Sequence, residues 1–397
     1  MFELSVDLPR PAPAAAAHSA HLIELIRQAI AASPTASVSF AQYMELALYA
    51  PGLGYYSAGL SKLGPAGDFV TAPEISPLFG RCIARQCSRI LAELRGGEIL
   101  ELGAGSGRLA ADLLLEMERL ESLPERYSIL DTSADLRARQ QTHLHASVPH
   151  LCSTIRWLDS LPEDRFTGII LANEVVDALP VHRFCITDQG IEELRVGNGQ
   201  AGRFIWIKEP AAEPELIERV ESIQSALDIP LSIPYLSELN LLLGPWIASL
   251  TERLERGLLL FIDYGYPRRE YYHPERRMGT LICHYRQRAH SDPLILTGLQ
   301  DITAFVDFTA VAEAASRCGL EVAGYTSQAH FLIASDLDKL LLELQSQEPN
   351  RYLDYARQAK LLTLPGEMGE RFKIMALTKD WHLPFEGLQR FDQRGRL

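Results

Sequence analysis

The chain has 397 residues, of which 47% are hydrophobic and 22% charged, and its formal net charge is −13. This length exceeds what one compact core holds, so we expect a main domain with an added or inserted part. The negative charge disfavours binding to nucleic-acid phosphates. The longest apolar stretches fall short of the ~20 residues that a membrane-spanning helix needs, so we expect no membrane insertion.

Two features bear on the cellular compartment. The six cysteines form no CxxC pair, a usage typical of reduced thiols rather than of a disulfide framework. The N-terminus carries the acids Glu3 and Asp7 and has no apolar signal-peptide core. We therefore expect a cytoplasmic protein. A mitochondrial matrix location is less favoured, because the N-terminus lacks the Arg-rich pattern of a presequence.

The N-terminal segment contains few periodic elements. A Pro/Ala-rich run at residues 9–17 is typical of a flexible arm, and apolar spacing over residues 21–31 predicts a helix. A stretch rich in glycine and proline follows at residues 51–77. Stretches of this kind are usually functional or disordered, and its aromatic side chains argue against disorder. We expect residues 1–76 to form an N-terminal arm and a lid-like segment.

Helices and strands then alternate along the chain. The pattern predicts helices over residues 77–95, 108–120 and 134–146. It predicts strands over residues 98–102, 127–130, 154–158 and 168–172. This alternation is typical of the α/β class, with a parallel sheet covered by helices on both faces.

The alternation breaks near residue 183. The sequence predicts β-hairpins over residues 182–208. It predicts helices over residues 211–227 and 235–256. A strand at 257–263, a helix at 303–318 and strands at 320–325 and 371–378 complete the sheet domain. That domain would span residues 77–182 and 257–397, with an inserted α+β subdomain at 183–256 facing the substrate or a partner. The polar loop 264–300 would lie over the carboxyl ends of the strands, where α/β proteins bind ligands.

The sharpest motif is ELGAGSG at residues 101–107. A predicted strand leads into a turn containing Gly103, Gly105 and Gly107, and the turn opens a helix. Glycine permits positive φ and the close approach of a ligand. Because nicotinamide enzymes use a similar turn, and some such turns are purely structural, the glycines alone leave the ligand open.

Two acids favour S-adenosylmethionine (SAM). Glu101 would repel the pyrophosphate of a dinucleotide, whereas SAM carries an ammonium and a sulfonium. Asp131 ends the second strand, where it can accept hydrogen bonds from ribose hydroxyls. It lies beyond the ~20-residue separation of the dinucleotide fingerprint. The residues of this region expected to hold SAM are Glu101, Gly103, Ala104, Gly105, Gly107, Asp131 and Thr132.

A second polar segment, NEVVDALP at residues 173–180, follows the apolar strand at 168–172. Its side chains would lie at the ligand edge of the sheet, with Asn173 touching the cofactor. A carboxylate there can hold a cationic nucleophile or remove its proton, so Glu174 is the first catalytic candidate and Asp177 the second. The alternative is that Glu174 only caps the following helix, since acids are favoured in a first turn.

The segment GDFVTAPEIS at residues 67–76 precedes the sheet. Its glycine and proline residues restrict it to an ordered turn. We expect it to act as a lid in which Thr71 and Pro73 contact the cofactor. The alternative is a packed connector without a role in the site.

Two later segments are expected to recognise the substrate or to scaffold a loop. The first is DYGY at residues 263–266, where the apolar strand at 257–263 ends, and the second is CHYR at residues 283–286. Cysteine, histidine and aspartate residues between 283 and 292 match no standard zinc spacing, so we expect no metal. The substrate-binding candidates are Asp263, Tyr264, His284 and Tyr285.

Together these motifs resemble the MidA family of SAM-dependent methyltransferases, which occurs in bacteria and mitochondria. The resemblance runs from about residue 40 to residue 379. Long motifs carry it, and they are far more specific than a Gly-rich loop. They include YMELALYAPGLGYY at 43–56, GDFVTAPEISPLFG at 67–80, ANEVVDALP at 172–180, GTLICHYR at 279–286 and QDITAFVDF at 300–308.

The resemblance implies a class I, Rossmann-like seven-strand methyltransferase fold with an extra, partly helical region. It also implies protein arginine methylation of a respiratory complex I subunit, since mitochondrial members are complex I assembly factors. The Arg-poor N-terminal arm fits a bacterial member. Arg81 departs from the family, which commonly has an acid after the PLFG segment, so the resemblance does not predict the contacts at that helix start.

Two functions remain open at this point. The first is an enzyme that transfers a methyl group from SAM to an arginine of a protein presenting a basic segment, a partner that the negative charge favours. The second is a SAM-binding assembly chaperone that acts by protein docking with little turnover. For the chaperone, the apolar residues 239–250 with Trp246 could offer a helical docking surface. Burial of that helix against the sheet domain is the competing explanation.

Overall fold

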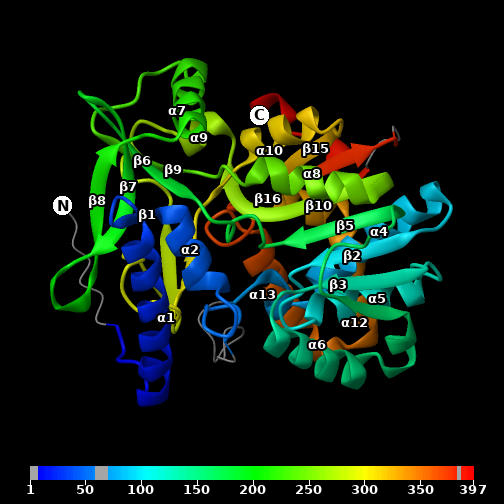
Figure 1. The fold of residues 1–397 in the computed structure, drawn as a ribbon. Coiled ribbons are helices and arrows are strands. Elements are labelled where there is room, and N and C mark those ends of the chain that lie inside the picture. Colours follow the sequence, from blue (N-terminus) through cyan, green and yellow to red (C-terminus); the bar gives the residue numbers. More distant parts are fainter. Residues whose placement is uncertain (1–7, 59–69, 382–385) are drawn as a thin grey trace. The chain divides into compact units, whose positions relative to one another are not determined.

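The computed structural model describes residues 8–58, 70–381 and 386–397 (Figure 1). The chain forms two compact units. The sheet unit comprises Val70–Val176, Gly244–Gly265 and Phe308–Leu397. The accessory unit comprises Met1–Phe69, Asp177–Leu243 and Tyr266–Asp307. Each unit is therefore assembled from segments that are far apart in the sequence.

The sheet unit is built on strands in the order β15-β16-β10-β5-β2-β3-β4 (Figure 1). β16 runs antiparallel to both neighbours, and the other adjacent strands are parallel. This topology confirms the predicted α/β class. The strands are β2 (Glu98–Leu102), β3 (Arg126–Leu130), β4 (Ile155–Leu158), β5 (Phe166–Asn173), β10 (Leu254–Tyr266), β15 (Glu321–Ser327) and β16 (Phe372–Lys379).

The central strands are apolar because both of their faces are covered. In β10, Leu258 and Leu260 belong to the large core that also contains side chains of α4 and α5. Phe261 alternates with them and packs on the other face, where its ring centroid lies 5.5 Å from that of Trp246 in α8. Strands buried on both faces have nearly continuous hydrophobic sequences, as β5 and β10 do.

The helices of the sheet unit pack closely. A Cβ added at Gly80 of α4 would lie 2.7 Å from the Cβ of Asp112 in α5, so glycine permits their approach.

No helix in the described ranges is long and apolar enough to cross a membrane. The α-helices here are α3 (Ala72–Ile75), α4 (Pro77–Leu94), α5 (Arg108–Arg119), α6 (Ala134–Ser147), α8 (Leu243–Arg253), α10 (Phe308–Arg317), α11 (Gln328–Ala334), α12 (Leu337–Gln347), α13 (Tyr352–Thr363) and α14 (Glu386–Gln389).

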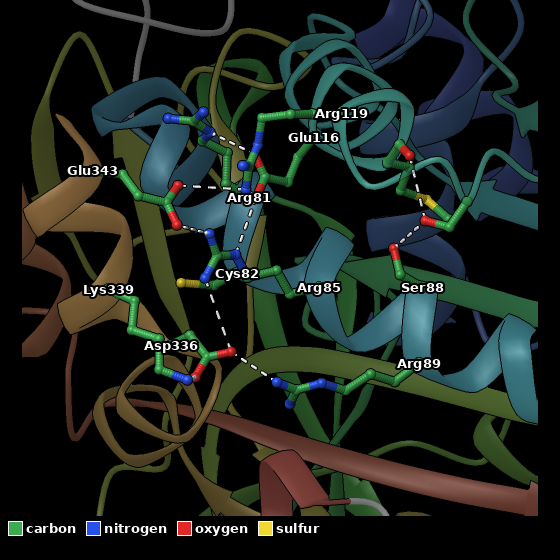
Figure 2. A network of polar contacts seen from close by, with 12 residues as sticks. Arg81, Cys82, Arg85, Ser88, Arg89, Glu116, Arg119, Asp336, Lys339 and Glu343 are labelled. Carbon is green, nitrogen blue, oxygen red and sulfur yellow. Dashed lines mark hydrogen bonds and ion pairs between the residues drawn. The ribbon is translucent and has the colours of Figure 1, made fainter. Parts of the chain in front are cut away.

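Figure 2 shows a charged network between α4, α5 and α12. Glu116 is 1% exposed, and its carboxylate lies 3.0, 3.0 and 2.6 Å from nitrogens of Arg81, Arg85 and Arg119. Burial alone would raise the pKa of Glu116, but the arginine contacts outweigh it and lower the pKa to about 2. Arg81, where the sequence departs from the family, therefore has an ionic partner on α5.

The accessory unit contains an antiparallel sheet of order β1-β7-β6-β9, with β8 paired to β7, and a small sheet β12-β11-β13. Helices α1 and α2 share one core with Val196 and Phe204, and α7 and α9 share another with Phe184. The elements are α1 (Pro13–Ala32), β1 (Ser37–Ser39), α2 (Phe40–Tyr49), β6 (His182–Thr187), β7 (Gly190–Asn198), β8 (Phe204–Pro210), α7 (Pro214–Ala226), β9 (Tyr235–Leu239), α9 (Arg268–Tyr271), β11 (Ile282–Tyr285), β12 (Arg288–His290), β13 (Asp301–Thr303) and β14 (Val306–Asp307).

The unit boundaries differ from the expected domain boundaries 77–182, 183–256 and 257–397. The sheet unit begins at Val70, and most of α8 belongs to it because Trp246 packs on β10. Residues 266–307 belong to the accessory unit, where β11 pairs with β12 and β13. The sheet unit is therefore interrupted by two segments of the accessory unit, Asp177–Leu243 and Tyr266–Asp307, where one insertion at 183–256 was expected.

Four sequence-based expectations are wrong in detail. Residues 235–239 form β9, not a helix, because they pair with β6. The arm expected at 9–17 is already helical from Pro13, and proline is favourable at a first helical position. The loop expected at 264–300 contains α9, β11 and β12. The apolar helix expected at 239–250 begins only at Leu243, as α8; its Ile247 and Leu250 are buried, which agrees with burial against the sheet unit rather than with a docking surface.

Candidate cofactor site

The glycine turn connects β2 to α5, as the sequence predicts. Gly103, Gly105 and Gly107 have φ values of 63°, 54° and 84°, a region that residues with a Cβ rarely occupy. A Cβ at Gly103 would lie 3.2 Å from Val175, and a Cβ at Gly107 would lie 3.3 Å from Gln140. The turn therefore requires glycine both for its backbone angles and for the approach of its neighbours. Ala104, between the glycines, is buried.

Glu101 lies in β2 and is 2% exposed. Its Oε2 accepts a hydrogen bond of 2.7 Å from the Tyr127 hydroxyl on β3. Burial raises the pKa of Glu101 to about 7; the Tyr127 hydrogen bond opposes this shift and the charge of Asp131 adds to it. A buried carboxyl group that ionises near neutral pH is suited to a nearby cation.

Asp131 follows β3 and is 8% exposed. Its Oδ1 accepts a 2.9 Å hydrogen bond from the Ser133 N–H, and its Oδ2 accepts a 2.8 Å hydrogen bond from Gln140 Nε2. These two hydrogen bonds fix the Asp131 carboxylate. Asp131 also lines a cavity of about 320 Å³. The lining residues are Asp131, Thr132, Ala134, Arg137, Ala138, Gln141 and Asp159.

The end of β5 lies beside the glycine turn, because β2 and β5 are parallel neighbours with Leu102 opposite Ala172. Glu174 has a φ of 54°, and its N–H donates to Ile262 O of β10 at 2.9 Å. Asn173 Nδ2 donates to Glu174 Oε1 at 3.3 Å. Asn173 Oδ1 is buried and has no hydrogen-bond partner among the described residues. A buried acceptor of this kind is unfavourable unless a ligand supplies a donor.

Asp263 organises the turn that carries Glu174. It is 1% exposed, and its carboxylate accepts hydrogen bonds from the N–H groups of Val176 at 3.0 Å and Tyr264 at 2.9 Å. The ring of Tyr264 packs edge-on against Phe372, with centroids 5.5 Å apart. These contacts give Asp263 a structural role at the strand end, which the sequence assigned to substrate binding.

The segment with Thr71 and Pro73 is attached to the glycine turn through Glu74. Thr71 is the N-cap residue of α3, and Pro73 is buried. Glu74 accepts a hydrogen bond from the Ser106 hydroxyl and lies 3.3 Å from Arg108 Nε. Residues 67–69 of the lid-like segment lie outside the described residues. The motif identified this segment, but nothing in the sequence singled out Glu74.

Three sequence-predicted site residues belong to the accessory unit. Asp177 is buried, and its carbonyl accepts a hydrogen bond of 3.0 Å from the Ala304 N–H. His284 and Tyr285 lie in β11. The pKa of His284 is lowered mainly by burial and further by the charge of His290. Across the described part of the chain, no group of three His, Cys, Asp or Glu side chains is placed to hold a metal ion.

The residues gathered at the ends of β2, β3 and β5 fit SAM chemically. Glu101 offers a carboxyl group to an ammonium, and Asp131 offers acceptors to ribose hydroxyls. The glycine turn leaves room for close approach, and Asn173 Oδ1 lacks a donor. The structure brings the predicted residues Glu101, Asp131 and Asn173 to neighbouring strand ends, together with Gln140, which the sequence did not single out because it occurs in a helix without a recognisable motif.

Solved structures resemble the whole chain. A Burkholderia thailandensis protein bound to S-adenosyl-homocysteine (SAH) is 40% identical, with a TM-score of 0.92 over 98% of this chain and 100% of that chain. A native structure of a Burkholderia thailandensis protein, also 40% identical, gives a TM-score of 0.90. The predicted class I methyltransferase fold and SAM cofactor are confirmed.

Curated relatives and a family model agree with this likeness. The zebrafish protein arginine methyltransferase NDUFAF7 is 28% identical over 86% of this chain and 84% of its own length. Human NDUFAF7 is 28% identical over 89% of this chain and 82% of its own length. The Methyltransf_28 model, which describes SAM-dependent methyltransferases, matches residues 82–326. The chain belongs to this family and is a SAM-dependent methyltransferase of the NDUFAF7 type.

Proposed function

We propose that this methyltransferase transfers the methyl group of SAM to an arginine of a protein partner. The names of the zebrafish and human relatives, both protein arginine methyltransferases, support this proposal. The observation that carries it is Glu174, an acid fixed beside the cofactor turn at the end of β5.

The chain's own residues would bind and orient the cofactor. Glu101 would face its ammonium, Asp131 its ribose, and the glycine turn its methionine end, with Thr132, Asn173, Thr71 and Pro73 nearby. Bound SAM supplies a methyl group that is already electrophilic. The protein therefore has to align the nucleophile with that group and exclude water, which is mainly a proximity effect.

Glu174 would orient the guanidinium and accept its proton. A guanidinium has a pKa above ~12, so an acceptor is needed as its nitrogen becomes bonded to the methyl group. The left-handed backbone of Glu174, held by Ile262, is an unfavourable conformation that is typical of functional positions. Asp177 follows three residues later and is the second candidate.

The partner would present a basic segment. The net charge of −13 favours a cationic protein and disfavours polyanions. Within the accessory unit, His284 and Tyr285 are the candidates for contacting it. In the sheet unit the candidate is Tyr264, and the buried Asp263 would hold the turn that carries it. The family resemblance extends the proposal to a subunit of a respiratory complex.

The Glu174→Gln variant tests the catalytic role. With radiolabelled SAM and a fractionated bacterial extract, it should transfer label to polypeptide at least about 100-fold more slowly than the wild type, because a general base is lost. Glu367→Gln, a change in an exposed glutamate of the same unit, is the matched control and should be unaffected.

An unchanged rate in Glu174→Gln would mean that Glu174 has no catalytic role. A wild-type protein that binds SAH but transfers no label to any fraction would instead favour the assembly chaperone.

A further inference from the structure

The side-chain amide of Gln140 joins three strand ends of the sheet unit. Gln140 lies in α6 and is fully buried, with 0% exposure. Its Nε2 donates to Gly105 O at 3.1 Å and to Asp131 Oδ2 at 2.8 Å. Its Oε1 accepts a hydrogen bond of 3.2 Å from Trp157 Nε1 in β4. The amide therefore links the glycine turn, the acid after β3, and β4.

The partners of Gln140 allow only one orientation of its amide. The indole N–H of Trp157 can only donate, whereas a carbonyl and an ionised carboxylate can only accept. A flipped amide would place its NH₂ group against the indole N–H and its oxygen against two acceptors. Trp157 thus fixes the amide so that both N–H groups face the cofactor-binding loops.

The glycine at position 107 also allows α6 to approach the turn closely. A Cβ at Gly107 would lie 3.3 Å from the Gln140 Cα, closer than most Cβ contacts in proteins. Glycine at this position therefore allows Gln140 to reach both Gly105 and Asp131. The hydrogen bond to Asp131 involves a charged group and is shorter than the one to the Gly105 carbonyl.

We propose that Gln140 is a positioning residue of the SAM site. By holding the Asp131 carboxylate and the Gly105 carbonyl at a fixed separation, it aligns the ribose-binding and methionine-binding parts of the site. This inference rests on the placement of the ribose at Asp131, as proposed above. It does not depend on which substrate receives the methyl group.

A purely structural role for Gln140 makes a different prediction. If the amide only satisfies buried polar groups of the fold, its loss should weaken every ligand of the site equally. If it positions Asp131, its loss should mainly weaken recognition of the ribose hydroxyls. The affinities for SAH and for its 2′-deoxy analogue separate these two roles.

The experiment is calorimetric titration of the full chain with both ligands. Gln140→Leu should bind SAH about ten- to a hundredfold more weakly, because a displaced Asp131 carboxylate loses its charge-assisted hydrogen bonds from the ribose hydroxyls. The wild-type preference for SAH over the 2′-deoxy analogue should shrink towards one. Trp157→Phe, which removes the indole donor that fixes the amide together with part of the ring, should change both quantities in the same direction by a smaller factor.

Thr142→Ala is the matched control, because this threonine lies on the exposed side of α6 and its hydroxyl donates to Ala138 O of its own helix. It should leave both affinities unchanged. Unchanged SAH affinity in Gln140→Leu, or an equal loss for both ligands, would overturn the proposal.

Asp131→Ala separates this proposal from its premise. It should weaken SAH binding by about ten- to a hundredfold. If it does so while Gln140→Leu does not, only the role of Gln140 fails. If Asp131→Ala binds SAH as the wild type does, the ribose placement fails and the inference fails with it. Methyl transfer to protein is measured separately, by label in polypeptide, so its failure is distinguishable from both outcomes.

Discussion

Glu101 and Glu116 are both buried glutamates of the sheet unit, yet their environments differ in charge. Glu101 has a tyrosine hydroxyl as its hydrogen-bond donor, and burial raises its pKa to about 7. Glu116 is surrounded by three arginines, and its pKa falls to about 2 although it is equally buried.

The difference shows how a buried acid can be functional in one place and structural in another. The charge of Glu116 is already compensated by α4 and α5, so this residue joins two helices (Figure 2). Ionised Glu101 lacks an arginine or lysine partner within the described ranges, so a cationic ligand would stabilise its charge. Substitutions at these two positions separate the two environments.

The largest effect is expected from Gly105→Val, in the turn that follows the strand of Glu101. A β-branched residue disfavours a φ of 54° and would occupy the space that the methionine part of SAM needs. SAH binding should become undetectable by calorimetry. Gly366→Val, at a position where an added Cβ meets nothing within 4 Å, should bind normally. Wild-type affinity in Gly105→Val would exclude this placement of the site.

Glu116→Gln tests the structural side of the comparison. Removing the charge takes away the one carboxylate that three arginines share, although Arg85 and Arg119 keep Glu343 as a partner. The change should lower the free energy of unfolding by roughly 2–4 kcal/mol, discounted for the partial exposure of Arg119. Urea denaturation at pH 7 measures this. Glu118→Gln, a change in an exposed acid of the same helix, should change stability by less than about 0.5 kcal/mol.

The pH dependence of the stability difference between the wild type and Glu116→Gln tests whether the stabilisation is ionic. Because folding lowers the pKa of Glu116 from 4.5 to about 2, its stabilisation is present above pH 4.5 and is lost as pH falls towards 2. The stability difference between wild type and Glu116→Gln should therefore shrink across that range. A difference that is as large at pH 3 as at pH 7 would rule out an ionic origin.

The smallest effect concerns the pH dependence of cofactor binding at Glu101. A cation binds the ionised carboxylate, so SAH affinity should be level above the Glu101 pKa of about 7 and fall below it, approaching tenfold per pH unit. Calorimetry between pH 5.5 and 8.5 measures this dependence. Glu101→Gln should remove it. A flat wild-type profile would mean that Glu101 does not contact the ammonium.

The sequence predicted those parts of the fold that depend on local pattern. β2, β3 and β5 are apolar runs followed by polar residues, so their type and their shared carboxyl edge followed from periodicity. Residues 235–239 were assigned to a helix because short apolar runs do not distinguish a helix from a strand. Pairing with β6, a long-range contact, decides that segment.

The supports of the site were less predictable than its motif. Glu101, Asp131 and the glycines stand at strand ends and could be identified from their spacing. Gln140 and Glu74 act through side-chain contacts across 35 and 32 residues of sequence, to Gly105 and Ser106. Asp263 reaches Val176 across 87 residues. Contacts of this kind depend on tertiary packing, which periodicity does not report.

The identity of the methylated residue tests the central claim most directly. The enzyme is incubated with methyl-labelled SAM and fractionated bacterial extract, and the labelled material is hydrolysed and separated. We predict label in polypeptide that is recovered as methylarginine and depends on Glu174. Label found only in small molecules or RNA, and never in polypeptide, would contradict it.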